Sequence, residues 1–289
     1  MSEIIVLILN MCFPVFAGMV LLLEKKEVPE EKLARKALTA MIIAACFGIL
    51  NITGGEKQLL LCYLGQDLPV YFHVDAMGRL FAAVVTGVWV LAVCYAGEYM
   101  KKEQEQKRFF GFVLIVYGIL MGLCYAGNLV TFYLFYEMMT LTTVPLVLHS
   151  RTREAITAGI KYLLYSLCGA YMVLFGTYVL NRYTTSLNFT PGGTLDLAAV
   201  SGHETLILIA AFLMILGFGV KAGMFPMHGW LSTAHPAAPA PASAVLSGVI
   251  VKMGVLGVTR VVYEIIGPEI IRGTWVQRTW IILALITIF

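Results

Sequence analysis

The sequence predicts an all-α integral membrane protein, and three observations lead to this fold class. First, 60% of the 289 residues are hydrophobic and only 13% are charged, whereas ordinary soluble domains are about a quarter charged. Second, the apolar residues gather in runs of the roughly 20 residues that a helix needs to cross the bilayer core. Third, the basic residues cluster between those runs, as topology signals do. A soluble core of this length could not bury so much apolar surface.

These apolar runs predict eight spanning helices, numbered here 1 to 8 in chain order. They fall near residues 4–23, 37–52, 74–97, 109–126, 128–149, 155–180, 205–222 and 241–263. A ninth run begins near Thr279 and has barely started at Phe289, so we expect this sequence to be the N-terminal part of a longer protein. The first run lacks the basic flank and the cleavage site of a signal peptide, which predicts a retained helix.

Lysine and arginine residues in the short loops predict the orientation. The loops after helices 1, 3 and 5 hold Lys25, Lys26, Lys32, Arg35, Lys36, Lys101, Lys102, Lys107, Arg108, Arg151 and Arg153. The intervening loops hold only Lys57 and Arg182. We therefore expect the basic loops in the cytoplasm, the N-terminus outside and the chain in the cytoplasmic membrane. Arg260, Arg272 and Arg278 near the end of helix 8 go against this rule.

Other sequence features exclude several classes of function. The net charge is only +3, which argues against a nucleic-acid partner. The six cysteines form no CxxC pair and no Cys/His cluster of metal-ligand spacing, and no glycine-rich phosphate loop is present. The sequence therefore predicts neither a metal nor a cofactor. Between helices 2 and 3, the alternating residues 68–74 predict a short strand on the outer surface.

Three charged residues within the predicted spans are the first candidates for function. A charge in a membrane span costs roughly 2.5 to 3.5 kcal/mol on insertion scales, so each is a functional hypothesis. Glu137 lies near the middle of helix 5, where a structural carboxyl bonded to nearby threonines is the alternative. Lys252 lies near the middle of helix 8, with apolar residues on both sides, which predicts a buried amine.

The third charge, Lys221, lies where helix 7 is predicted to break. Glycine and proline weaken a helix, and they cluster here at Gly217, Gly219, Gly223 and Pro226. The carbonyl end of the first half-helix would favour the ammonium of Lys221. The alternative is a lysine that extends to the cytoplasmic surface.

Two histidines between these lysines suggest a proton relay. His228 and His235 titrate near neutral pH and can pass a proton on. Either histidine alone could equally be structural, but two neighbouring lysines within the membrane favour the relay. Lys161, early in helix 6, fits an interfacial position and a relay position equally well.

The segment from Lys221 to Gly254 resembles the signature of a known family. KAGMFPMHGWLSTAHPAAPAPASAVLSGVIVKMG is similar to the antiporter-like subunits shared by respiratory complex I (NADH:quinone oxidoreductase), group 4 membrane-bound hydrogenases and Mrp-type cation/proton antiporters. The pattern Phe-Tyr-Glu137-Met-Met is similar to the fifth helix of the same family, and the resemblance covers helices 3 to 8. It implies that Glu137, Lys221 and Lys252 are the ionisable residues of that family's helices 5, 7 and 8. Ser232 and Thr233 depart from the family, which usually has a proline and then a carboxylate there.

The resemblance also implies a fold of two inverted five-helix repeats. Residues 1–108 would hold helices 1 to 3, residues 109–263 the first repeat, and residues 264–289 a loop and the start of a truncated second repeat. The implied function is proton translocation, with Na⁺ coupling left open, by a subunit without a redox centre of its own. Its partners would be other membrane subunits of a redox-driven or antiporter complex. Separating Glu137 from Lys221 would lower the lysine pKa and release a proton toward His228, His235 and Lys252.

Two other functions compete with this interpretation. An autonomous secondary transporter of a small solute would use the broken helix as its substrate site. A haem- or quinone-reducing membrane enzyme needs paired histidines at mid-depth on neighbouring helices. His73, His149 and His203 all fall at predicted helix ends or in loops, which argues against the enzyme.

Overall fold

The computed structural model describes residues 3–24, 29–64 and 68–288. Lys25 and Lys26, which contribute to the predicted orientation, and the last residue, Phe289, lie outside these ranges. Within the described residues, eight helices are long and apolar enough to cross a membrane. The predicted class, a multi-spanning helical membrane protein, is therefore confirmed.

The long helices lie close to the predicted runs. Their bounds are α1 Glu3–Leu23, α2 Glu30–Thr53, α3 Ala76–Tyr99, α4 Gln106–Cys124, α5 Leu129–Val147, α6 Arg153–Tyr183 and α8 Glu204–Ala222. The last long span joins α10 Ala240–Val245, η2 Leu246–Ile250, α11 Val251–Arg260 and η3 Val261–Ile266, of which η2 and η3 are π-helical. The shorter helices are η1 Met100–Lys102, α7 Leu197–Val200, α9 Leu231–Ala237, α12 Pro268–Ile271 and α13 Trp275–Ile288.

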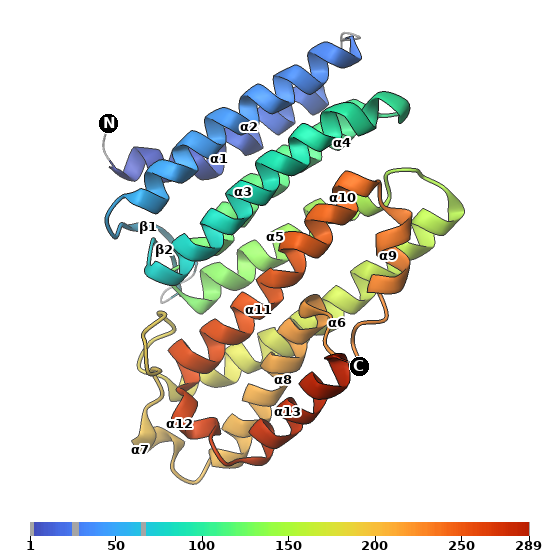
Figure 1. The fold of residues 1–289 in the computed structure, drawn as a ribbon. Helices are drawn as coiled ribbons and strands as arrows, with labels where there is room; N and C mark the ends of the chain where they lie inside the picture. Colours follow the sequence, from blue (N-terminus) through green and yellow to red (C-terminus); the bar gives the residue numbers. More distant parts are fainter. Residues whose placement is uncertain (1–2, 25–28, 65–67, 289) are drawn as a thin grey trace.

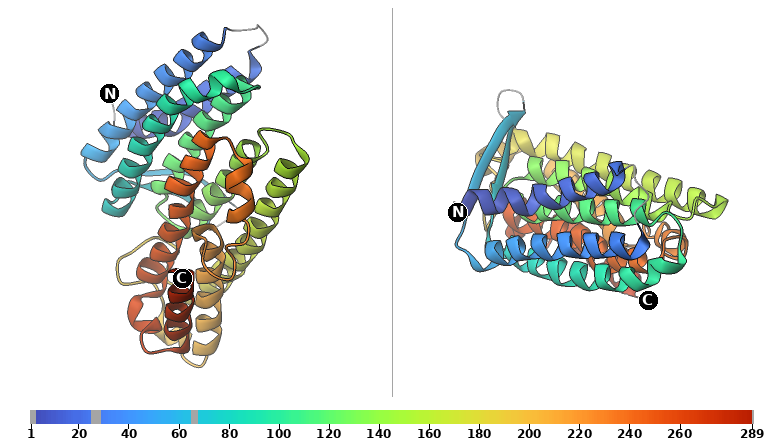
Figure 2. Two further views of the ribbon diagram at one scale, coloured as in Figure 1. Left: turned by 45° about the vertical axis from the view of Figure 1, so that its right-hand side comes forward. Right: turned by 90° about the horizontal axis from the view of Figure 1, so that it is seen from above.

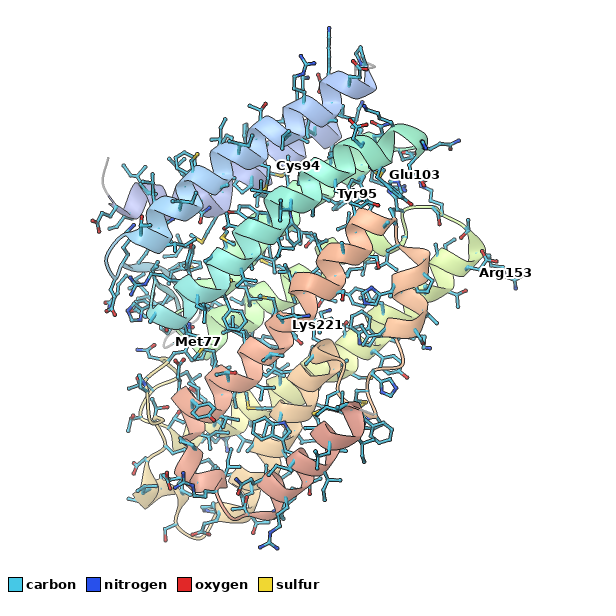
Figure 3. The ribbon with its side chains drawn as sticks, in the orientation of Figure 1. Met77, Cys94, Tyr95, Glu103, Arg153 and Lys221 are labelled. Carbon is cyan, nitrogen blue, oxygen red and sulfur yellow. The ribbon has the colours of Figure 1, made fainter. Side chains whose placement is uncertain are left out.

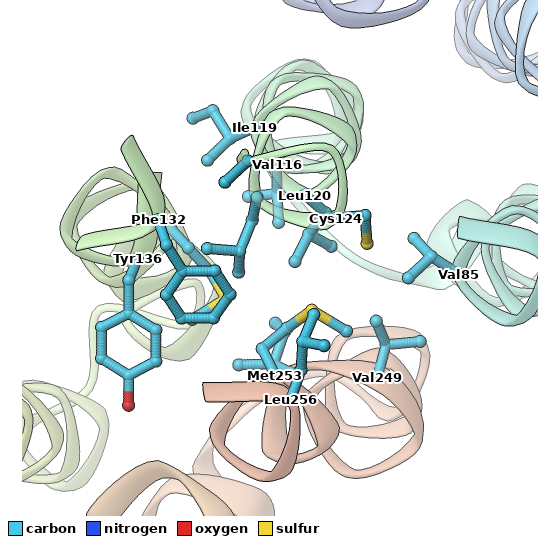
Figure 4. Close-up of a cluster of buried hydrophobic side chains, with 14 of the residues drawn as sticks. Val85, Val116, Ile119, Leu120, Cys124, Phe132, Tyr136, Val249, Met253 and Leu256 are labelled. Carbon is cyan, nitrogen blue, oxygen red and sulfur yellow. The ribbon is translucent and has the colours of Figure 1, made fainter. Parts of the chain in front are cut away.

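The long helices lie side by side and nearly parallel (Figures 1 and 2). α4 is the most enclosed of the long helices. Of its most apolar stretch 83% is buried, because α1, α2, α3 and α5 all pack around it. Beyond α5, α6 packs on α8, and α8 packs on α11 and α13. Figure 4 shows the centre of the core, where Val85 of α3, Leu120 of α4, Phe132 of α5 and Met253 of α11 approach one another. α1, α2 and α3 bury smaller shares and leave wide apolar faces exposed.

Polar residues set where several helices begin. An N-terminal side chain that accepts from the first turn satisfies a backbone N–H that has no helical partner. Asp75 accepts from Gly78 N at 2.7 Å and starts α3. Asn128 accepts from Thr131 N at 2.8 Å and starts α5, and Thr152 accepts from Ala155 N at 3.2 Å and starts α6.

A β-hairpin covers one end of the bundle. β1 (Gln58–Leu64) and β2 (Leu68–His73) pair antiparallel, with Leu59 opposite Phe72. β2 lies where the sequence predicts a strand, whereas β1 was not predicted. Figure 3 shows Met77 at the hairpin end and both Glu103 and Arg153 at the opposite end. The loops after α3 and α5, predicted to share one side of the membrane, therefore lie at the same end of the molecule.

Helical geometry stops at Ala222 and resumes at Leu231. Gly223 has a left-handed conformation with φ of 75°, which a residue with a side chain adopts at a cost. The N–H of the next residue, Met224, bonds back to Gly219 O at 2.8 Å, which satisfies a carbonyl in the last turn of α8. This ending places Lys221 in the last turn of α8, deep in the bundle.

Candidate functional site

Lys221 lies in a cage of three hydroxyl groups. Its side chain is completely buried, with 0% exposure. Nζ donates to Tyr162 Oη at 2.7 Å, to Ser166 Oγ at 2.9 Å and to Thr140 Oγ1 at 3.0 Å. An ammonium has three protons, so these three acceptors satisfy all of them. Figure 3 shows Lys221 in the middle of the bundle.

Aromatic rings close the cage. Lys221 Nζ lies 4.2 Å from the ring centroid of Tyr162 and 6.0 Å from that of Trp230. Both distances are in the range of cation–π attraction. Trp230 Nε1 donates to Val220 O at 2.8 Å, which fixes the indole beside the end of α8. Hydroxyl oxygens and aromatic rings therefore surround the amine of Lys221.

Small residues let the helices approach closely enough to form this cage. A Cβ on Gly169 of α6 would lie 2.6 Å from Gly217 O of α8, and a Cβ on Gly217 would lie 2.5 Å from Gly169 O. The two backbones thus touch where glycine faces glycine, as at close helix crossings in membranes. On the other side, a Cβ on Gly254 of α11 would lie 2.5 Å from Ala222 N. These contacts hold α8, the helix that carries Lys221, between α6 and α11.

A hydrogen-bond chain leads from the lysine into α5. Tyr162 Oη lies 2.7 Å from Thr143 Oγ1, and Thr143 Oγ1 donates to Met139 O at 2.8 Å. When Lys221 donates to Tyr162, the phenol can donate to Thr143, and Thr143 to the carbonyl. The chain then runs in one direction and leaves none of these groups without a partner.

Glu137 lies beside this cage but does not pair with the lysine. It is half-buried on α5, three residues before Thr140 and so on the same face of the helix. Glu137 Oε1 is buried without a hydrogen-bond partner among the described residues. In that part of the chain no ion pair within 4.0 Å joins Glu137 to Lys221, because the ammonium faces the hydroxyls instead. The two charges still interact electrostatically.

The structure corrects the predicted burial of Lys252. Its side chain is exposed on the surface of the chain, and Nζ donates to Ser247 O, a carbonyl of the preceding turn, at 2.8 Å. Apolar neighbours along α11 indicated a helix within the membrane but not which face of it turns inward. Lys252 therefore lies on the surface, apart from the buried cage of Lys221.

The histidines occupy different surroundings. His235 is half-buried, its Nδ1 lies 3.0 Å from Ser243 Oγ, and its ring stacks on Trp230 at 6.4 Å between centroids. Trp230 thus lies near both Lys221 and His235. His228 is exposed and stacks on Phe225 at 5.8 Å. The structure places His235 against the ring of Trp230 and leaves His228 at the surface.

Tyr162, Ser166 and Trp230 were missed by the sequence analysis. On α6 the sequence analysis singled out Lys161, which is half-buried. The residue that bonds to Lys221 is the next one, Tyr162. A signal was present, since Tyr162 and Ser166 are four residues apart and share one face of an otherwise apolar helix. Nothing in the sequence indicates that this face meets Lys221, because the contact joins residues far apart in the chain.

Comparisons with known proteins agree on one family. The family model described as "NADH:quinone oxidoreductase/Mrp antiporter, TM" matches residues 126–289, more than half of the chain. A second model, "NADH-Ubiquinone oxidoreductase (complex I), chain 5 N-terminus", matches residues 64–110.

Individual relatives point the same way. Hydrogenase-4 component B of Escherichia coli (strain K12) is 31% identical over 70% of this chain, and one of the Na(+)/H(+) antiporter subunits of Alkalihalophilus pseudofirmus is 32% identical over 68%. The chain spans 30% of the length of the first and 24% of the second. A chain of the Mrp complex from Dietzia sp. DQ12-45-1b has the same fold, with a TM-score of 0.74 at 18% identity over 90% of this chain and 49% of that one.

Proposed function

The chain belongs to the NADH:quinone oxidoreductase/Mrp antiporter family of membrane subunits, and we propose that it translocates protons through the site around Lys221. One observation carries the proposal: an amine that is completely buried within a membrane bundle donates to three hydroxyl groups. Burying a charge in a membrane is costly, so such residues mark ion pathways and proton relays.

The hydroxyl cage supports a lysine that changes its protonation state. A charged lysine donates to all three hydroxyls, as described above. A neutral amine has a free lone pair, and Tyr162 can then donate to Nζ while it accepts from Thr143. The same atoms therefore satisfy both forms, and neither state leaves a buried polar group unpaired.

Glu137 acts in this proposal as a movable counter-charge. A carboxylate close to Lys221 stabilises the ammonium, and separating the two in a site of low dielectric favours release of the proton. Among the described residues no ion pair joins Glu137 to Lys221, which supports assigning this arrangement to the separated state of the proposal. A proton released from Lys221 would pass to His235 beside Trp230, and His228, Lys252 and Lys161 are further relay positions.

The fold details implied by the family are part of the same proposal. α8 and α9 would be the two halves of one discontinuous spanning helix, interrupted between Ala222 and Leu231. Residues 109–263 would form the first inverted repeat, after three N-terminal helices in residues 1–108, and residues 264–289 would begin the second. The N-terminus and the hairpin end would face outward, with the basic loops in the cytoplasm. Cysteine labelling of positions 32, 102 and 190 from each side tests this orientation.

Energy for translocation would come from partner subunits. Related chains are named as components of a hydrogenase and of a Na(+)/H(+) antiporter. We propose that this chain has no redox centre of its own and works within such a membrane complex. Our leading hypothesis is a redox-driven complex. The chain carries H⁺ in this proposal, and coupling to Na⁺ is to be tested.

The experiment replaces Lys221 in the full complex. Lys221→Ala should abolish proton translocation in membrane vesicles when the rate is divided by the amount of assembled complex. Lys101→Ala, which removes an exposed lysine paired with Glu98, is the matched control and should translocate normally. Normal translocation by Lys221→Ala would end the proposal. Uptake of a small solute by the purified chain alone would support an autonomous transporter instead.

A further inference from the structure

A second group of charges, largely shielded from solvent, lies at the hairpin end of the bundle, away from Lys221. Arg260, the last residue of α11, is 1% exposed. Its guanidinium donates to both carboxylate oxygens of Asp75, at the start of α3, with Nη2 to Oδ1 at 2.8 Å. Nη1 also donates to Glu264 Oε2 at 2.7 Å. We call Asp75, Arg260 and Glu264 the arginine cluster.

The arginine cluster has one acidic group more than its single cation can neutralise. Arginine stays charged in proteins, and the ring of Phe189 lies 4.8 Å from its guanidinium carbon. Two ionised carboxylates held this close repel each other, so ionisation of both is disfavoured. With both carboxylates ionised, the three side chains would carry one net negative charge, which one bound proton would neutralise.

The two carboxyl groups are not equivalent. Asp75 receives two N–H groups of Arg260 and the N–H of Gly78. Burial alone would raise the pKa of Asp75, but the hydrogen bonds and charge of Arg260 outweigh it and hold the pKa below its ordinary value of 3.8. Glu264 receives one N–H of Arg260, on Oε2. Asp75 is therefore the ionised partner, and Glu264 is the carboxyl left to take up a proton.

A loop fixes Glu264 close to the surface. The N–H groups of Thr190, Gly192 and Thr194 donate to the carbonyls of residues 264, 263 and 265 at 3.2, 3.0 and 2.8 Å. These bonds satisfy carbonyl groups in the last turn of the span. That turn is π-helical, and π-helical turns are often found at functional sites. The side chain of Glu264 is 8% exposed, so it is shielded while still near the end of the bundle.

Other ionisable groups approach the arginine cluster from the neighbouring elements. His73 of β2 interacts electrostatically with both carboxyl groups, and its Nε2 lies 3.7 Å from Glu56. Cys124, at the end of α4, lies within electrostatic range of Arg260 and Asp75. Arg79, one turn along α3, donates to Gly54 O at 3.2 Å. Among the described residues, Arg260 is the only lysine or arginine in an ion pair with Glu264.

A polar atom inside the arginine cluster is also unused. Arg260 Nε is buried without a partner within the described part of the chain. A buried donor without an acceptor costs free energy, so Nε adds to the polar groups in this cluster that favour a further acceptor.

We propose that Glu264 is a proton-binding site, protonated at neutral pH on Oε1 while Asp75 stays ionised against Arg260. The site exchanges protons at the hairpin end of the bundle. It does not depend on the Lys221 relay, because none of its residues takes part in the hydroxyl cage.

Infrared spectroscopy of the full-length protein, as a difference between neutral and alkaline pH, tests the proposal. The wild type should show the C=O absorption of a protonated carboxylic acid at neutral pH that disappears at alkaline pH. Glu264→Gln should lose this absorption. Asp75→Asn should lose it too, because Glu264 then becomes the only counter-charge of Arg260 and ionises. Glu269→Gln, which removes an exposed carboxylate paired with Arg272, is the control and should keep it.

Two further outcomes would overturn the proposal. Persistence of the absorption in Glu264→Gln would show that the proton is bound elsewhere, and its persistence in Asp75→Asn would show that the charge of Asp75 does not keep Glu264 protonated. Glu264→Gln should also fold with an unchanged Tm, because an amide is as neutral as a protonated acid and still accepts from Arg260. Failure of this variant to fold would mean that the cluster needs an ionised Glu264, contrary to the proposal.

Discussion

The amine of Lys221 and the phenol of Tyr162 are hydrogen-bonded at 2.7 Å in the interior of a membrane-spanning bundle. Because Tyr162 in turn reaches Thr143 at 2.7 Å, the phenol can either accept from the lysine or donate to it. This property distinguishes the site from a fixed ion pair, which favours only the charged amine. The consequences can be measured residue by residue.

Tyr162→Phe should impair translocation more than assembly. The change removes one acceptor from a buried ammonium, and hydrogen bonds to charged groups contribute roughly 1.5–3 kcal/mol. We expect translocation to fall about tenfold or more, since 1.4 kcal/mol corresponds to a factor of ten. Tyr171→Phe, on the same helix but 68% exposed, is the control and should be unaffected. Equal activity of the two variants would remove Tyr162 from the mechanism.

Gly254→Ala should destabilise the protein. The new methyl group would lie 2.5 Å from Ala222 N and 2.6 Å from Phe218 O, and these backbone atoms cannot give way without moving α8. Overpacking of this kind costs about 1–3 kcal/mol. Gly87→Ala in α3 has no heavy atom within 4 Å and should be neutral or slightly stabilising. Thermal unfolding in detergent compares the two, and an unchanged Tm for Gly254→Ala would contradict the predicted clash.

His149, outside the spans, should make stability depend on pH. Its side chain is 4% exposed, and burial lowers its pKa below the ordinary value of 6.5. As the pH falls below that value, the unfolded chain takes up a proton that the folded one resists, so stability present above it is lost. Tm should drop as the pH is lowered from about 7.5 to about 5.5, a range that brackets the ordinary histidine pKa. The drop in Tm should be smaller in His149→Gln than in the control His228→Gln, which changes an exposed histidine. Equal drops in both variants would contradict this.

Lys252 should matter for translocation in spite of its exposure. If it belongs to the relay, Lys252→Ala lowers translocation far more than assembly. Lys252→Arg keeps the charge but should impair proton release, since a guanidinium hardly deprotonates. Proton uptake by vesicles with the assembled complex measures both effects, and full uptake by the alanine variant would exclude Lys252 from the relay.

Helix positions could be predicted from the sequence because membrane burial affects every residue of a span. The runs near 109–126 and 205–222 correspond closely to α4, Gln106–Cys124, and α8, Glu204–Ala222. β1 was missed because its register depends on pairing with β2. Arg260 was counted as a charge that violated the loop rule, yet it is buried in an ion pair with Asp75 and is no loop charge. That partner lies 185 positions away in the sequence.

The site could be predicted only in part. Lys221 was identified because glycines and a proline mark the end of its helix within a span. Its partners Tyr162 and Ser166 depend on the packing of α6 against α8, which no local pattern encodes. Lys252 was expected to be buried, but an apolar stretch does not tell which face of a helix turns inward. The distance between Glu137 and Lys221 is likewise a property of the packed helices.

The most direct test of the central claim is a double-mutant cycle of Glu137 and Lys221, with neutral residues of similar size at each position, measured on assembly of the full complex. If Glu137 is the counter-charge, each single change leaves a buried charge uncompensated, which typically costs about 3–5 kcal/mol. The double variant should then recover assembly while translocation stays absent, with a clear interaction energy between the two positions. Additive losses, without interaction energy beyond error, would contradict the counter-charge mechanism.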